Sequence, residues 1–132
     1  MRNNIYKVRF LLNSGLWQKH LIQKMVFREL VLEVDEDNYD DFLNNGISVL
    51  NFFSDWKMDC LMIFPMLEAL AEELNGKICF GKVNVEECEK LAEMHRVSKV
   101  PCVLIFKNGE LVERINNCDS EEFLRERIFC LI

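Results

Sequence analysis

Short apolar runs recur along the chain between segments with helical spacing. Residues 47–53 are apolar almost throughout, as expected of a central strand that is covered on both faces. Residues 29–34, 78–85, 103–106 and 111–115 also favour strands, and an Asn-Gly turn joins the last two into a predicted β-hairpin.

Helices are predicted between the strands. Asp37 is a good N-cap for a helix over residues 38–44, which Asn45-Gly46 would end. Residues 88–94 predict a second short helix.

The two longer helical patterns are amphipathic. The first covers about residues 59–74, and its predicted inward side chains are Met62, Ile63, Met66, Leu67, Leu70 and Leu74. The second begins near Ser120, and its predicted apolar side chains are Phe123, Leu124, Ile128 and Leu131. Early βαβ units, a hairpin and a final helix together predict an α/β fold, in which a mixed sheet of five strands lies between helices on both faces.

The first 28 residues differ from the rest in charge. They carry six basic side chains and no acidic one, so residues 29–132 sum to -12 although the whole chain has a net charge of -6. We therefore divide the chain into a basic extension, residues 1–28, with spacing compatible with a helix, and one domain, residues 29–132. Three interpretations of the extension stay open: a mitochondrial transit peptide, a helix that covers the domain or docks on a partner, and an upstream extension without function.

Composition argues against several classes of function. No apolar run approaches the ~18 residues that a membrane span needs, and the acidic net charge argues against nucleic acid as a partner. The six cysteines are scattered, with Cys79 and Cys102 in apolar strand runs, which favours reduced thiols in an intracellular, cytoplasmic protein. There is no Cys-x-x-Cys motif, and His20 and His95 stand alone, so neither a metal site nor a cofactor is predicted.

The candidate site is the turn that follows the central strand. Residues 54–60 read Ser-Asp-Trp-Lys-Met-Asp-Cys and lead directly into the longest predicted helix. A tight turn there places its residues at a helix N-terminus, where free N–H groups and the helix dipole favour a negative charge. Such a position suits a reactive thiolate at Cys60.

Five segments in order resemble the thioredoxin family: residues 49–56, 61–68, 82–85, 100–106 and 107–110. The resemblance covers roughly residues 29–129 and implies a thioredoxin fold with a thiol site at the turn. The site departs from the family pattern, because Trp-Lys-Met-Asp-Cys stands in place of Trp-Cys-Gly-Pro-Cys. Lys57 replaces the attacking cysteine, Cys60 keeps the position of the resolving cysteine, and Asn51 replaces the family's buried aspartate.

Each candidate residue has a chemical and a structural interpretation. A protonated Lys57 would favour a Cys60 thiolate, whereas burial would oppose it. Because free cysteines are commonly buried, we interpret Cys60 as an inert, half-buried thiol. The helix dipole should lower the pKa of Lys57 and favour a nucleophilic amine, but without a neighbouring catalytic group we interpret it as a solvated surface lysine. Cys102 stands where the family usually has threonine, and pairing of Cys60 with Cys102 is a further hypothesis.

Pro101 matches the cis-proline of the family, which forms the wall opposite the turn and offers main-chain groups to an extended peptide. Trp56 and Val100 would line the same groove. Asn117 replaces a glycine in the third loop of the groove, so its side chain would narrow that loop.

Two of the three groups that the family uses for exchange, the attacking cysteine and the buried aspartate, are replaced in this chain. Exchange needs both an attacking thiolate and a resolving neighbour. The sequence therefore predicts a thioredoxin-like protein that has lost dithiol–disulfide exchange and binds proteins or extended peptides, or acts as an accessory module. The alternative is an atypical thiol oxidoreductase in cell redox homeostasis that uses Cys60 alone or with Cys102. A third hypothesis makes the basic extension the functional part.

Overall fold

The structure is a computed structural model that describes residues 30–43, 46–116 and 118–132. Five strands form one sheet in the order β1-β3-β2-β4-β5. They are β1 (Val31–Glu33), β2 (Ile47–Phe53), β3 (Ile78–Asn84), β4 (Cys102–Lys107) and β5 (Glu110–Ile115). The first three strands are mutually parallel, whereas β4 is antiparallel to β2 and β5 is antiparallel to β4, so the predicted mixed sheet of five strands is confirmed.

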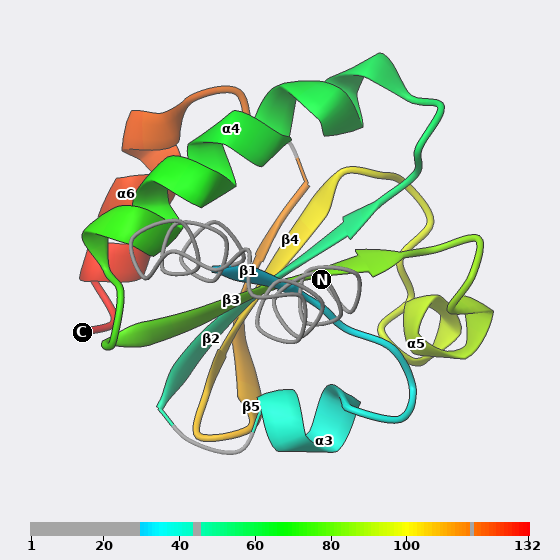
Figure 1. The fold of residues 1–132 in the computed structure, drawn as a ribbon, viewed down its shortest axis with the longest axis horizontal. Helices are drawn as coiled ribbons and strands as arrows, with labels where there is room; N and C mark the ends of the chain where they lie inside the picture. Colours follow the sequence, from blue (N-terminus) through cyan, green and yellow to red (C-terminus); the bar gives the residue numbers. More distant parts are fainter. Residues whose placement is uncertain (1–29, 44–45, 117) are drawn as a thin grey trace, which may run out of the picture.

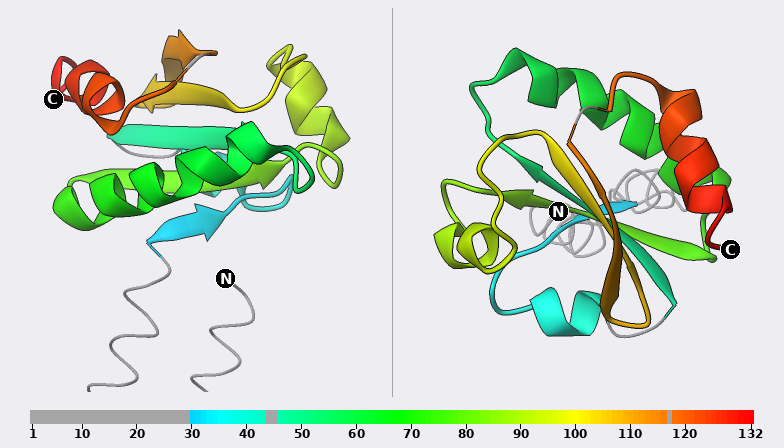
Figure 2. Two further views of the ribbon diagram at one scale, coloured as in Figure 1. Left: turned by 90° about the horizontal axis from the view of Figure 1, so that it is seen from above. Right: turned by 180° about the vertical axis from the view of Figure 1, so that it is seen from behind.

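Helices cover both faces of the sheet (Figures 1 and 2). Two of them, α4 (Met58–Glu73) and α6 (Glu121–Phe129), pack on one face. The other face is covered by α3 (Tyr39–Phe42) and α5 (Glu89–Met94). Each face therefore has its own hydrophobic core, with β2 buried along its whole length between them.

Side chains of β2 and β4 alternate between the two cores, as the period of a strand requires. Val49 and Val103 point toward α4 and α6, whereas Phe52 and Leu104 point toward α3 and α5. This alternation decides on which face of the sheet each candidate side chain of the site lies.

The start of α3 differs from the prediction. Asn38, not Asp37, occupies the N-cap position, and its side chain makes no capping hydrogen bond. The Asp35 carboxylate instead accepts the N–H groups of Asp37 at 2.9 Å and Asn38 at 3.1 Å. Because this turn precedes the helix, α3 begins one residue later than predicted and ends at Phe42. The predicted stop at Asn45 lies outside the described residues.

The inward face of α4 also differs in part. Ile63 and Leu67 are buried as predicted, but Met62 is 63% exposed and Met66 is only partly buried. The buried face of α4 continues along the helix to Leu70 and Ala71, so Met62 and Met66 lie at the edge of that face.

The C-terminal part of the fold follows the sequence signals closely. Asn108 and Gly109 both have positive φ angles, 51° and 85°, as an Asn-Gly hairpin turn requires. The Ser120 hydroxyl accepts the Phe123 N–H at 3.1 Å and caps α6, as predicted. Phe123 itself, expected on the apolar face, is 40% exposed.

None of the helices within the described ranges has the length and apolar character that a membrane span requires. Residues 1–28 lie outside the described residues, so the interpretations of the basic extension, including a mitochondrial transit peptide, stay predictions.

Candidate functional site

The candidate site lies where β2 ends and α4 begins. Hydrogen bonds between polar side chains join this turn to the last residue of β3 and to the loop that follows it. The Ser54 hydroxyl donates to the Glu86 carboxylate at 2.8 Å, and the Asn84 amide donates to the Asp55 carboxylate at 3.1 Å. The N-terminus of α4 is therefore held in place by contacts outside its own helix.

Cys60 lies in the first turn of α4 and is completely rather than half buried. Its sulfur accepts the main-chain N–H of Ser54 at 3.4 Å. Burial raises the pKa of the Cys60 thiol and outweighs the Ser54 hydrogen bond and the charge of Lys57, which both lower it. A shielded thiol with a raised pKa is poorly suited to nucleophilic attack.

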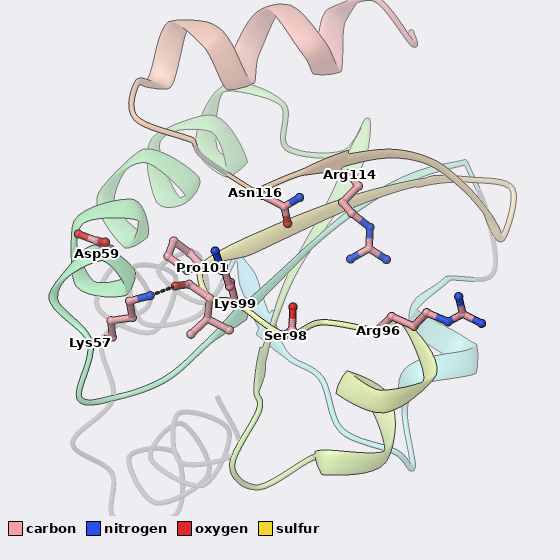
Figure 3. Close-up of a pocket in the computed structure, with 9 residues that line it drawn as sticks. Lys57, Asp59, Arg96, Ser98, Lys99, Pro101, Arg114 and Asn116 are labelled. Carbon is pink, nitrogen blue, oxygen red and sulfur yellow. Dashed lines mark hydrogen bonds between the residues drawn. The ribbon is translucent and has the colours of Figure 1, made fainter.

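Lys57 occupies the N-cap position of α4 and reaches across the site. Its Nζ atom donates a hydrogen bond of 2.6 Å to the main-chain carbonyl oxygen of Val100 (Figure 3). Because the side chain is partly buried and bridges the turn to the opposite loop, the interpretation of Lys57 as a solvated surface lysine is wrong. Lys57 occupies the sequence position at which the family has its attacking cysteine.

The opposite loop contains a cis peptide bond between Val100 and Pro101. Both residues line a cavity of about 610 Å³ beside the turn (Figure 3). The other residues that line this cavity are Lys57, Asp59, Arg96, Ser98, Lys99, Arg114 and Asn116. The structure thus brings three predicted site residues together around one hollow: Lys57, Val100 and Pro101.

The remaining two predicted groove residues are Trp56 and Asn117. Trp56 is 75% exposed and is not among the residues that line this cavity. Asn117 lies outside the described residues, so its effect on the third loop stays a prediction.

Sequence reasoning missed three basic residues of this cavity: Arg96, Lys99 and Arg114. The first two come shortly before Pro101 in the chain, so their position was a usable signal. Arg114 comes from β5, where it is the register partner of Leu104. Its guanidinium group donates to the carbonyl oxygen of His95, a contact between β5 and the end of α5 that local sequence does not reveal.

A smaller cavity of about 310 Å³ adjoins the first and shares Asp59, Pro101 and Asn116 with it. Met62, Met66 and Cys118 are among its lining residues. The Cys118 thiol is partly exposed and donates to the Ser120 carbonyl oxygen at 3.6 Å, and burial raises its pKa. This thiol was not singled out from the sequence.

Cys60 and Cys102 are not brought together as a pair. Cys102 is completely buried in the core beneath α3 and α5, with Phe52 as its register partner. Cys60 belongs to α4, which packs on the opposite face of the sheet. A disulfide needs Cβ atoms that point toward each other, so this arrangement opposes the predicted pair. Burial also raises the pKa of the Cys102 thiol, although the charge of Arg114 lowers it.

Asn51 lies on β2 next to Val103 and is completely buried on the α4 side of the sheet. Within the described part of the chain, neither its Oδ1 nor its Nδ2 atom has a hydrogen-bond partner. The amide does not titrate, so the position of the family's buried aspartate carries no proton-accepting group here.

The mixed sheet, the helices on both faces and the cis-proline loop opposite the α4 N-terminus define a thioredoxin-like protein. A family model described as "Thioredoxin" matches residues 30–129. A thioredoxin from Chlamydia pneumoniae is 36% identical over 99 residues, which cover 75% of this chain and 96% of that protein. A thioredoxin from Staphylococcus saprophyticus is 33% identical over 98 residues, covering 74% and 94%.

Among solved structures, a mutant thioredoxin from Halobacterium salinarum NRC-1 superposes with a TM-score of 0.73 at 29% identity, covering 79% of this chain and 92% of that one. The chain belongs to the thioredoxin family. The family resemblance and the fold inferred from the sequence are thereby confirmed.

Proposed function

We propose that this thioredoxin-family protein has lost ordinary dithiol–disulfide exchange and acts as a protein- or peptide-binding or accessory module through the groove beside Pro101. The observation that carries the proposal is that Lys57 occupies the sequence position of the attacking cysteine and that its amine donates to the Val100 carbonyl oxygen. Exchange transfers two electrons from a pair of thiols to the substrate disulfide, which leaves as two thiols. Cys60 supplies only one of that pair.

A second candidate function is a slow thiol oxidoreductase that uses Cys60. The relatives are called thioredoxins, which favours redox chemistry. The Ser54 N–H and the charge of Lys57 also lower the pKa of Cys60. Burial of the sulfur acts in the opposite direction and is the larger effect. The location of Cys102 in the core beneath α3 and α5 argues against the paired version of this function.

An insulin-reduction assay separates the two candidates. For a binding module, we expect the wild-type chain and the Cys60→Ser variant to reduce insulin equally slowly, because the buried thiol of Cys60 contributes nothing. Turnover by the wild type well above that of Cys60→Ser would establish thiol-dependent exchange and overturn the proposed loss of activity.

The binding half of the proposal has its own test. Titration of the isotopically labelled chain with extended peptides should shift the amide resonances of the loop that contains Val100 and of the N-terminus of α4. Shifts confined to another surface, or no shifts with any peptide, would contradict binding at this groove.

A further inference from the structure

Cations gather at the cavity beside Pro101 although the domain is acidic. Residues 29–132 contain ten basic and 22 acidic side chains, which gives the net charge of -12. Four of the ten basic residues line this single cavity: Lys57, Arg96, Lys99 and Arg114. Asp59 is the one carboxylate among the described residues that line it. The cavity is therefore a local positive site on a negatively charged surface.

Among the described residues, none of these four charges is paired with a carboxylate, and two of them are held in place by main-chain carbonyl oxygens. In residues 30–43, 46–116 and 118–132, the ion pairs with carboxylates involve two arginines of α6 and none of the cavity cations. Lys57 donates to the carbonyl oxygen of Val100, and Arg114 donates to that of His95. A neutral carbonyl fixes the position of a side chain but leaves its positive charge available to a ligand.

Main-chain recognition at this groove is restricted. An extended peptide that adds to the edge of a groove relies on free main-chain donors and acceptors. The Val100 carbonyl oxygen is already the acceptor for Lys57. We therefore expect binding here to depend more on side chains, and four of the five charged residues that line this cavity are cationic.

Apolar side chains line the smaller cavity, which also borders Pro101. Met62 and Met66 are among them, and Met62 is largely exposed. A chain segment that crosses Pro101 would meet these flexible apolar side chains in one cavity and the cations in the other. Methionine side chains adapt to apolar partners of different shape.

We propose that the groove selects an extended peptide with Asp or Glu side chains on the Lys99 and Arg114 side of Pro101 and an apolar side chain on the Met62 side. This inference rests on the proposed function and names the chemistry of its ligand. Guanidinium groups bind carboxylates with paired hydrogen bonds. The chain's own residues 1–28 are unsuitable, because they contain no acidic side chain. A long polyanion such as nucleic acid would be repelled by the rest of the acidic domain.

The test uses the full chain and three fluorescent peptides of equal length with the same apolar residue. The remaining positions carry Glu, Gln or Lys. In anisotropy titrations at low salt, we expect the Glu peptide to bind about tenfold more tightly than the Gln peptide, which corresponds to about 1.4 kcal/mol. The Lys peptide should bind most weakly, and added salt should reduce the advantage of the Glu peptide.

A double variant, Arg96→Gln with Lys99→Gln, assigns the selectivity to this cavity. It should bring the Glu and Gln peptides to nearly equal affinity. The matched control is Lys77→Gln with Lys107→Gln, which changes the net charge equally. Both control residues are exposed and lie beside the first residues of β3 and β2, at the opposite end of the sheet from the cavity. Thermal unfolding of each variant verifies that it folds.

Each outcome has a distinct meaning. The predicted pattern in both double variants supports the inference. Equal binding of the Glu and Gln peptides overturns acidic selectivity but leaves peptide binding intact, whereas no binding of any peptide overturns both proposals. If the control variant lost the preference for the Glu peptide over the Gln peptide to the same extent, the preference would be assigned to overall charge and the inference overturned. Tighter binding of a single-stranded oligonucleotide than of the Glu peptide at the same salt would also overturn it.

Discussion

The residue at position 57 determines two properties of the site: the absence of an attacking thiol and the presence of a positively charged side chain. Replacing Lys57 by Cys creates a Cys-x-x-Cys sequence with Cys60 and removes the hydrogen bond to Val100. We predict that Lys57→Cys reduces insulin clearly faster than the wild type, because an attacking sulfur then stands at the N-terminus of α4. The double variant Lys57→Cys/Cys60→Ser is the control. It has no resolving thiol, so its mixed disulfide with the substrate should persist and the substrate should be released slowly. A rate for Lys57→Cys no higher than wild type would show that more than this residue has been lost.

Asn51 is the second residue at which the site departs from its family. Both polar atoms of its buried amide are without a partner in the described part of the chain. Substitution by Leu, which has nearly the same shape, should raise the free energy of unfolding by about 1–2 kcal/mol, because an unsatisfied buried polar group is removed. Chemical denaturation measures the change.

The matched variant Asn51→Asp places a carboxyl group at the same buried point. Burial should raise its pKa in the folded state above the unfolded value of about 3.9, so its stability should fall as the pH rises from acid to neutral. If Asn51→Leu proved less stable than the wild type, the amide would have to be satisfied in solution.

At the scale of elements, a histidine joins α5 to α3. His95 follows α5, its Nε2 atom forms a hydrogen bond with the Tyr39 hydroxyl, and its ring packs edge-on against Phe52 and Phe106. Two effects lower the pKa of His95: burial, which is the larger, and the positive charge of Arg114. The folded chain therefore binds its proton less readily than the unfolded chain, whose histidine titrates near about 6.5.

The sign of the resulting pH dependence follows from linkage. The stability contributed by neutral His95 is fully present above the unfolded pKa and is lost as the pH falls toward and through the lowered folded pKa. We predict that the free energy of unfolding decreases between pH 7 and pH 5 by denaturant titration, and that His95→Gln shows a smaller decrease. The same slope in His95→Gln would assign the pH dependence to other groups.

Element types were predictable where one signal dominates. The buried run of β2, the Asn-Gly hairpin and the Ser120 cap each depend on neighbouring residues, and each is confirmed. The start of α3 was misplaced because the Asp35 carboxylate accepts the N–H groups of Asp37 and Asn38 and so holds both residues in a turn before the helix. Met62 was misplaced because its apolar character alone does not determine which side of α4 faces the sheet.

At the scale of the whole molecule, the site combines segments that lie far apart in sequence. Lys57 and Pro101 were predicted because the family resemblance places them opposite each other. Arg114 was missed because its place beside the cavity depends on the pairing of β5 with β4 and on a contact with the end of α5. The placement of Cys60 on α4 and of Cys102 in the core beneath α3 and α5 likewise depends on which face of the sheet each element occupies.

The distribution of thiols over the molecule gives a test of this placement. All six cysteines are free thiols, with Cys79 and Cys130 exposed and Cys60, Cys88 and Cys102 buried. Burial raises the pKa of each of these three, so both shielding and protonation slow their reaction. With a chromogenic disulfide reagent, we predict that the exposed pair reacts rapidly in the native chain and that the buried three react only after denaturation. The Cys60→Ser variant should therefore leave the rapid native phase unchanged and reduce the count in denaturant by one. Loss of rapid amplitude in that variant would place the Cys60 thiol at the surface and favour the oxidoreductase over the binding module.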